Sequence, residues 1–240
     1  MANRAKTEKQ DLKNRVYEIL REKLINCEYA PGTMLNEAQL SVELGVSRTP
    51  IREALNRIEH EGFVSILPKK GIYVTNVGLN DVLHIFGARL EIEPIALRMA
   101  GPLLPEQQLL EFKAQFMGEE PDIRGAFRVD TAMHLFLIEY CGNRYIIDMM
   151  RKVFDENTRV IISSKQNEIK IHDARKEHVE ILDLLLDKDY DRAQKAMRTH
   201  IECCKKAALD FFYNFSAFPT QTPQTTYQTH LQAGNSTSSH

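Results

Sequence analysis

Several features of membrane-inserted, secreted and disulfide-stapled proteins are missing from this sequence. No apolar run reaches the roughly 18 residues that a membrane-spanning helix needs. The opening segment, MANRAKTEKQ, has no apolar stretch after its positive charges, so we expect no secretory signal. Four cysteines are too few for a disulfide framework, and Cys27, Cys141, Cys203 and Cys204 show no C-x-x-C spacing. These absences predict a cytoplasmic protein that does not enter a membrane.

Net charge is also small. The 240 residues include 31 Lys and Arg against 33 Asp and Glu, and 43% of them are hydrophobic. This composition is typical of a globular protein and excludes a wholly disordered or fibrous chain. The charges are nevertheless unevenly distributed, because the chain up to Gly78 carries a net +2 and the remainder a net −4. A mildly basic N-terminal part and an acidic C-terminal part predict two regions with different partners.

The last part of the chain lacks charged residues altogether. From Phe211 to His240 there is no Lys, Arg, Asp or Glu, and Thr, Gln and Ser dominate. Such a segment buries too little apolar surface to fold alone. We therefore predict a disordered polar tail over residues 216–240 and a flexible N-terminus over residues 1–10. Between them we expect a small α+β domain, residues 11–78, and an all-helical domain, residues 79–215.

Turn and capping residues divide the smaller domain into elements. Residues 11–26 have apolar side chains at helical spacing. Asn36, followed three residues later by Gln39, is typical of a capping box, and the short helix that it starts ends at Gly45. A second helix begins near Ser47–Thr49 and ends at Gly62. Residues 63–67 and 72–77 then read as two strands joined by a tight turn.

The larger domain is helical in pattern throughout. Its apolar periodicity is interrupted near Gly101, Gly118–Pro121, Gly142 and residues 187–189. These breaks predict an all-α bundle of about six helices. The expected fold class is therefore mainly α, with an α+β domain preceding a helical bundle.

The order of elements in the smaller domain is that of a winged helix-turn-helix, a DNA-binding unit. Its second helix has one apolar face and presents Arg48, Arg52 and Asn56 on the opposite face. A guanidinium offers the planar fork that matches guanine O6 and N7, and hydroxyl groups donate to phosphate. Alternatively, these arginines only solvate a helix surface, but the element order and the basic hairpin tip favour DNA. The predicted DNA-binding residues are Ser47, Arg48, Thr49, Arg52, Asn56, Lys69, Lys70 and Gly71.

Four polar residues of the larger domain lie on apolar faces of three predicted helices. They are Asp130 and His134, four residues apart, together with His178 and His200. A buried carboxylate needs a partner, and one Asp with three imidazoles suits a divalent metal ion such as Zn, Ni or Mn. Alternatively, each histidine is a core residue bonded to a backbone carbonyl. Four polar groups on three apolar faces favour a shared metal site.

Two further histidines, His84 and His172, are expected at the surface. His172 is six residues before His178, and at about 100° per residue this places it roughly 120° away from the face of His178 around the helix axis. Sharing a site with His178 is therefore not expected.

The segment from Ala30 to Val74 carries a resemblance to a known family. The sequence APGTMLNEAQLSVELGVSRTPIREALNRIEHEGFVSILPKKGIYV resembles the DNA-binding domain of the GntR family of bacterial transcription regulators. The resemblance implies a homodimer on a double-stranded operator with a short inverted repeat. It also implies DNA contacts from Ser47, Arg48, Thr49, Arg52 and Gly71. Ala38 stands where relatives often have a basic residue, so one contact of the family is missing.

The segment from Asn80 to about Asp210 resembles the FCD ligand-binding domain of the FadR subfamily. The similarity is clearest in ARLEIEPIALRMA, VDTAMHLFLIEYCGN and EHVEILDLLLDKDYDRAQKAMRTHI. It implies a metal bound by Asp130, His134, His178 and His200, and a small carboxylate effector that completes the coordination. Arg89 matches a position whose arginine faces the effector cavity. A salt bridge to Glu93 or a surface position is the alternative for Arg89.

The sequence thus predicts a DNA-binding transcription regulator, a repressor in the commoner case, whose operator affinity depends on an organic acid bound at the metal. The helix over residues 80–99 is a candidate dimer interface. A metal-responsive regulator, with the ion itself as signal, is the alternative. A metal-dependent hydrolase is a further alternative, but no inward-facing carboxylate stands out as a general base. An enzyme is therefore not expected.

Overall fold

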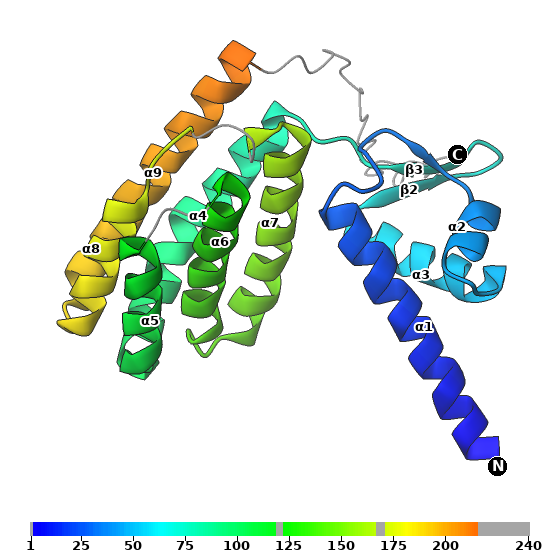
Figure 1. Ribbon diagram of the computed structural model, residues 1–240, viewed down its shortest axis with the longest axis horizontal. Coiled ribbons are helices and arrows are strands. Elements are labelled where there is room, and N and C mark those ends of the chain that lie inside the picture. The colour runs from blue at the N-terminus through cyan, green and yellow to red at the C-terminus, as the bar shows by residue number, and fades with distance from the viewer. Residues whose placement is uncertain (1, 119–121, 167–170, 216–240) are drawn as a thin grey trace, which may run out of the picture.

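The computed structural model describes residues 2–118, 122–166 and 171–215, which form two domains (Figure 1). The N-terminal domain contains α1 (Ala2–Ile25), β1 (Met34–Leu35), α2 (Glu37–Glu43), α3 (Arg48–Glu61), β2 (Val64–Leu67) and β3 (Gly71–Val74). The helical domain contains α4 (Leu79–Ala100), a 3-10 turn (Gly101–Leu103), α5 (Glu106–Met117), α6 (Ile123–Glu139), α7 (Arg144–Ser163), α8 (Arg175–Leu186) and α9 (Tyr190–Phe215). This arrangement confirms the predicted fold class. No helix of these described residues is long and apolar enough to cross a membrane.

The first helix is longer than the sequence pattern predicts. It begins at Ala2, whereas apolar periodicity starts it at residue 11 and leaves residues 1–10 as a flexible N-terminus. The added residues are mostly Ala, Arg, Lys, Glu and Gln, which favour a helix without any apolar face. A search for apolar periodicity therefore misses them. The predicted tail over residues 216–240 lies outside the described residues.

A three-stranded antiparallel sheet completes the N-terminal domain. Its order is β1-β3-β2, with Leu35 opposite Ile72 and Leu67 opposite Gly71. The hairpin between β2 and β3 was expected, although both strands are shorter than predicted. Strand β1 was not expected, because two residues are too few for an alternating pattern. In the hairpin, Lys69 and Gly71 have φ angles of 62° and 119°, the left-handed region that a tight turn requires.

Helix ends in this domain follow the capping residues. The side chain of Asn36 accepts hydrogen bonds from the backbone N–H groups of Ala38 and Gln39, at 2.8 and 3.3 Å, and starts α2. Gly62 has a φ of 92° and ends α3. Buried Leu20, Ile51 and other apolar residues of α1, α2, α3 and the sheet form the core of this domain.

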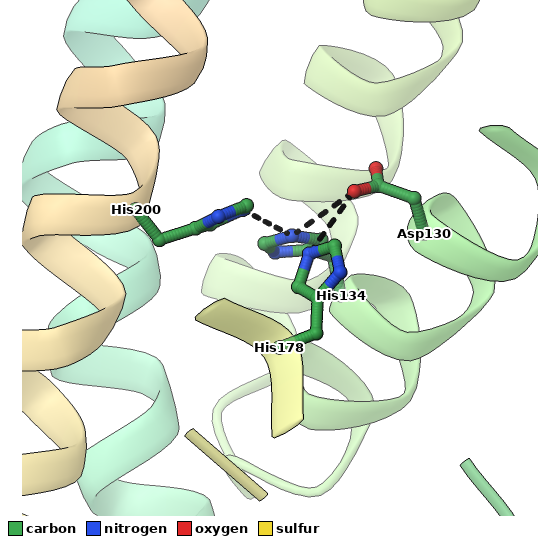
Figure 2. Close-up of side chains that lie close together, drawn as sticks. All are labelled: Asp130, His134, His178 and His200. Atoms are coloured by element: carbon green, nitrogen blue, oxygen red, sulfur yellow. Dashed lines mark hydrogen bonds and ion pairs between the residues drawn. The ribbon is translucent and has the colours of Figure 1, made fainter. Parts of the chain in front are cut away.

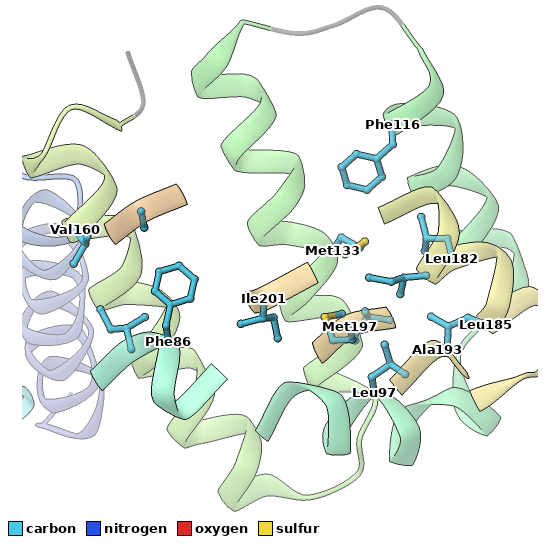
Figure 3. Packing of buried hydrophobic residues seen from close by; sticks show 14 of the residues in the cluster. Phe86, Leu97, Phe116, Met133, Val160, Leu182, Leu185, Ala193, Met197 and Ile201 are labelled. Atoms are coloured by element: carbon cyan, nitrogen blue, oxygen red, sulfur yellow. The ribbon is translucent and has the colours of Figure 1, made fainter. Parts of the chain in front are cut away.

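The core of the helical domain lies between its six described helices. Leu97, Met133, Leu182 and Ile201, from α4, α6, α8 and α9, belong to one buried cluster (Figure 3). Helix α7 ends at Ser163 and α8 begins at Arg175, and the sequence pattern did not predict that these helices are separate.

Helix α7 joins the two domains. It is the bundle helix that runs beside α1 in Figure 1. Arg21 of α1 forms an ion pair with Asp155 of α7 at 2.5 Å. Arg159, which is 1% exposed, donates a hydrogen bond to the Thr75 carbonyl at 2.7 Å, and its guanidinium lies 5.3 Å from the Phe63 ring centre. The N-terminal domain is therefore attached to the bundle by buried and half-buried polar contacts as well as by the chain itself.

Candidate functional site

Helix α3 presents a polar surface to solvent. Ile51 and Leu55 are fully buried, so the opposite side of the helix is exposed, with Arg48, Arg52 and Asn56 on it. Ser47 precedes the helix, is exposed, and makes no capping hydrogen bond with its side chain to the described backbone. The hydroxyl of Ser47 therefore lies next to the free N–H groups of a helix start, an arrangement that suits a phosphate.

The tip of the β2–β3 hairpin carries the other predicted DNA-binding residues. Lys69 and Lys70 are exposed, and Gly71 is half-buried beside them. A Cβ at Gly71 would lie 3.2 Å from the sulfur of Met34, which is tight, and the positive φ disfavours a side chain as well. Glycine at this position allows the tight turn. It would also allow the tip of the β2–β3 hairpin, the wing of a winged helix-turn-helix, to come close to a DNA duplex.

A neighbouring acidic residue orients Arg52. Glu37, at the start of α2, accepts hydrogen bonds from Nε and Nη2 of Arg52 at 3.0 and 2.6 Å. The Arg52 side chain remains 65% exposed. The hydrogen bond from Arg52, opposed by partial burial, lowers the pKa of Glu37. Glu37 was not singled out from the sequence, where it reads only as part of a helix start.

In the helical domain, the four predicted metal ligands converge. Asp130 and His134 on α6, His178 on α8 and His200 on α9 point toward one another (Figure 2). Each offers one ligand atom, and these atoms all lie within 4.8 Å of one another. All three histidine side chains are buried, and Asp130 is half-buried. The inward faces inferred from helical spacing therefore do meet at one point.

The distances within this cluster leave room for a cation. Nε2 of His134 lies 3.1 Å from Nε2 of His200 and 3.9 Å from Oδ1 of Asp130. Nε2 of His178 lies 3.1 Å from the same Asp130 oxygen, yet among the described residues both ring nitrogens of His178 lack a well-formed hydrogen bond. A buried imidazole without a partner is costly, and a metal at its nitrogen would satisfy it. The donor set, three imidazoles and one carboxylate, fits a first-row divalent ion.

A buried carboxylate on α4 holds His134 from behind. Glu93, 2% exposed, lies 2.5 Å from Nδ1 of His134 through Oε2 and 2.5 Å from Nε of Arg89 through Oε1. Burial would raise the pKa of Glu93, but the charges of Arg89 and His134 lower it to about 2. Glu93 is therefore ionised and fixes which ring nitrogen of His134 faces the cluster. The alternative considered for Arg89, a salt bridge to Glu93, is present.

A second carboxylate holds His200 in the same way. Glu177, on α8, lies 2.8 Å from Nδ1 of His200 and 2.9 Å from Nε2 of His172. His172 is not one of the four clustered residues, as expected, but it is half-buried and Glu177 connects it with His200. The helical angle used for this expectation does not apply, because α8 begins at Arg175 and His172 lies outside it.

The ionisation states in the cluster suit metal binding. Burial lowers the pKa of His200 to about 4, against the opposing hydrogen bond with Glu177, so its imidazole is neutral at pH 7. Burial would raise the pKa of Asp130, but His178 and the other histidines lower it well below its ordinary value. Burial raises the pKa of the Cys204 thiol far above its ordinary value, so this neighbour of His200 stays protonated as long as no metal is bound to it.

A cavity of about 100 Å³ opens beside the cluster. Asp130 and His178 are among its walls, together with residues of α5, α6 and the segment before α8. Arg89, predicted to bind an effector, is not among the described lining residues. It is buried on the α4 side, 4.9 Å from the ring centre of Phe154, and its Nη2 has no hydrogen-bond partner in the described structure.

Two functional residues, Glu93 and Glu177, were missed as part of this site. Glu93 shares a helix face with Phe86 and Leu97, which are both buried, so the periodicity that found the histidines could have found it too. Glu177 gives a weaker signal, because it lies one residue before His178 and is only half-buried.

Comparison with known proteins gives matches to both domains. The family model of the bacterial regulatory proteins of the gntR family matches residues 12–74, and the FCD domain model matches residues 84–202. The chain is 26% identical over 198 residues to the HTH-type transcriptional repressor RspR of Escherichia coli, covering 80% of this chain and 87% of that protein. It is 26% identical over 184 residues to the Nta operon transcriptional regulator of Aminobacter aminovorans, covering 74% and 85%. A solved GntR regulator from Rhodococcus has a similar fold, with a TM-score of 0.69 at 22% identity, covering 83% of this chain and 98% of that one.

Proposed function

Because the chain is a transcription regulator of the GntR family with an FCD domain, we propose that it binds an operator as a homodimer and responds to a small carboxylate effector at the Asp130/His134/His178/His200 site. One observation carries this proposal: α7 contacts both the N-terminal domain and the four-residue cluster of the helical domain. Phe154 of α7 packs 5.8 Å from the ring of His134, while the next residue, Asp155, pairs with Arg21 of α1. The relatives and the fold are those of regulators and not of enzymes, which argues against a hydrolase.

The exposed face of α3 is proposed to enter the major groove. Arg48 and Arg52 would read base edges, and Ser47 and Thr49 would bind phosphate. Lys69 and Lys70 would contact the backbone from the wing. Their exposure in the structure supports these assignments.

The four clustered residues are proposed to hold a divalent metal, Zn, Ni or Mn. Such an ion, once bound, would offer a Lewis-acidic site for a carboxylate. The protein would contribute the rest: Glu93 and Glu177 orient two imidazoles, and Arg89 supplies a buried positive charge. The unpartnered Nη2 of Arg89 supports a role toward the effector carboxylate from the α4 side of the cluster, since Arg89 is not among the described residues that line the cavity.

Coupling between the two sites is proposed to pass through α7. An effector that binds one arrangement of the bundle better would shift the position of the N-terminal domains, and so the spacing of the two α3 helices in a dimer. Coupling of about 1–3 kcal/mol would change operator affinity by roughly 5–150-fold. Repression is the proposed outcome, supported by the repressor name of the Escherichia coli relative.

A homodimer interface on α4 is proposed as well. Three large apolar side chains, Leu83, Ile95 and Met99, are 40%, 47% and 41% exposed on this helix. Ile95 and Met99 are four residues apart and so share one face of α4, and an exposed apolar pair of this kind supports a contact with a second copy.

Binding to the chain's own promoter tests the regulator. We expect fluorescence anisotropy at physiological salt to show preference for this DNA over a shuffled sequence. An Arg48→Ala/Arg52→Ala variant should lose at least about 30-fold in affinity, since each bidentate base contact contributes about 1–3 kcal/mol. Arg151→Ala, an exposed arginine of α7 that pairs with Glu139, is the control and should bind normally. No preference for the promoter would refute the proposal.

Elemental analysis and operator binding together separate the effector reading from the metal-responsive one. We expect about one metal per chain, lost in a His178→Ala/His200→Ala variant. Operator affinity that follows free metal within the cellular range, without any organic acid, would instead favour the ion as signal.

A further inference from the structure

The cavity beside the metal-ligand cluster reaches only one side of it. Of the four clustered residues, Asp130 and His178 line the cavity, whereas His134 and His200 are not among the described lining residues. A molecule in this cavity therefore approaches the cluster between α6 and α8. The space has about 100 Å³ for water-sized groups, where a single water needs roughly 10–15 Å³. It is large enough for a chain of a few carbon atoms and too small for a nucleotide.

The wall of this cavity is mostly apolar. Five described lining residues have large hydrophobic side chains: Phe116, Ile123, Phe127, Val129 and Ile171. The ring of Phe116 lies 4.5 Å from the ring of His178, so the apolar wall begins directly at the cluster. A ligand whose head group sits at the cluster would place its next carbon atoms against these side chains.

The cationic groups along the described wall are already engaged by carboxylates. Arg175 donates from Nε and Nη2 to the two oxygens of Asp173, both at 3.0 Å. His172 pairs with Glu177 at 2.9 Å. A second carboxylate on the ligand would thus enter an apolar space next to Asp173 without a cation dedicated to it. The side chains of Arg175 and Asp173 keep 34% and 41% exposure, so this rim is open to water, but a carboxylate placed among the apolar side chains deeper in the cavity would be removed from water without a cation of its own, which is unfavourable.

We propose that the effector is a monocarboxylic acid with a short apolar chain of about four or five carbon atoms, and not a di- or tricarboxylic acid. This inference rests on the proposed function, because it assumes that a carboxylate binds at the cluster. The carboxylate lies at Asp130 and His178 on the cluster side, and the alkyl chain fills the space lined by Phe116, Phe127 and Ile171. Apolar contact with the wall supplies the selectivity.

Pentanoate and glutarate test this proposal, since they share a five-carbon chain and differ only at the far end. Both are titrated calorimetrically into the full-length, metal-loaded protein. We expect pentanoate to bind at least tenfold more tightly than glutarate and to change operator affinity. A Phe127→Lys variant introduces a cation into the wall and should shift the preference toward glutarate. Phe127→Leu keeps the wall apolar and should preserve the preference for pentanoate. Metal content is measured for every variant.

The outcomes separate this inference from the proposed function. Glutarate binding as tightly as pentanoate to the metal-loaded wild-type protein would overturn the apolar-chain proposal and leave a carboxylate site standing. An unchanged preference in a metal-loaded Phe127→Lys variant would overturn the placement of the chain in this cavity. If pentanoate, glutarate and acetate all fail to bind, the effector part of the proposed function fails as well.

Discussion

At the scale of single residues, the most informative side chains are the two carboxylates behind the metal-ligand cluster. Glu93 and Glu177 each contact Nδ1 of a histidine, which leaves Nε2 of His134 and His200 facing the cluster. The carboxylates thus select the tautomer and hold the rings in place. This is an arrangement that a bare set of core histidines, each bonded to a backbone carbonyl, would not need.

Replacing either carboxylate should weaken metal binding. We expect Glu93→Gln and Glu177→Gln each to reduce metal affinity by about 10–100-fold, as is typical for outer partners of metal-bound histidines. Competition with a chromophoric chelator measures this directly. His172→Ala should have a smaller effect, because it removes only the outer partner of Glu177. Unchanged affinity in both glutamine variants would show that the carboxylates do not support the site.

The contact between Glu37 and Arg52 leads to a prediction about DNA specificity. Glu37→Gln removes a charge from a largely exposed pair, so we expect the free energy of unfolding to change by less than about 1 kcal/mol. The guanidinium of Arg52 would lose its fixed orientation, and base preference at the position that it reads should relax. Binding to a set of singly substituted operators measures this. Glu53→Gln, which breaks a pair with Lys13, is the control and should retain wild-type preference. An unaltered preference in Glu37→Gln would contradict the positioning role.

The burial or exposure of a residue was predictable from the sequence where helical periodicity alone determines it. Ile51 and Leu55 are buried and Arg52 is exposed because apolar residues recur every three or four positions on one face of a helix. The same spacing correctly predicted that His178 and His200 are buried. The helical angle between His172 and His178 was wrong because helical spacing was applied to residues before the start of α8 at Arg175. Which polar groups meet across the bundle depends on how α4, α6, α8 and α9 pack against one another. This packing involves residues far apart in the sequence, so local sequence patterns do not predict it.

At the scale of elements, turn chemistry determined most boundaries correctly. Asn36 starts α2 and Gly62 ends α3, as capping rules require. Elements without such signals were missed. Strand β1 exists only because β3 provides a partner for it, and the extension of α1 to Ala2 depends on helix propensity without an apolar face.

Two glycines with different backbone conformations should respond in opposite ways to alanine. Gly62 ends α3 with a φ of 92°, so Gly62→Ala should lower the free energy of unfolding by about 1 kcal/mol. Gly87 lies within α4, is exposed, and has nothing within 4 Å of an added Cβ in the described structure. Gly87→Ala should therefore stabilise the protein by about 0.4–1 kcal/mol. Urea denaturation of both variants measures the two effects. Equal signs would contradict the helix-end geometry described for Gly62.

At the scale of the whole molecule, the two domains are joined twice. The chain passes from β3 into α4 through four residues, 75–78. A separate set of contacts from α7, made by Asp155 and Arg159, reaches α1 and Thr75. The FCD-like bundle therefore contacts the N-terminal domain through a helix that also packs against the metal-ligand cluster.

Removing Arg159 should loosen the two domains from each other. In Arg159→Met the Thr75 carbonyl loses its donor, and we expect the free energy of unfolding to fall by about 1–3 kcal/mol. Differential scanning calorimetry should also show two thermal transitions in place of a single cooperative one. Arg151→Met, at an exposed position of the same helix, should melt like the wild type. A single unshifted transition in Arg159→Met would mean that this contact does not couple the domains.

The double attachment of the N-terminal domain also limits how that domain can move. A body held at one point can swivel in every direction, whereas a body held at two points turns only about the line that joins them. Here the first point is the chain at residues 75–78, and the contacts of Asp155 with Arg21 and of Arg159 with Phe63 together form the second. While both attachments hold, α3 can move relative to the bundle only along one arc. The orientation of the N-terminal domain relative to the bundle is then described by one angle. A small shift of α7 would change this angle and with it the position of α3.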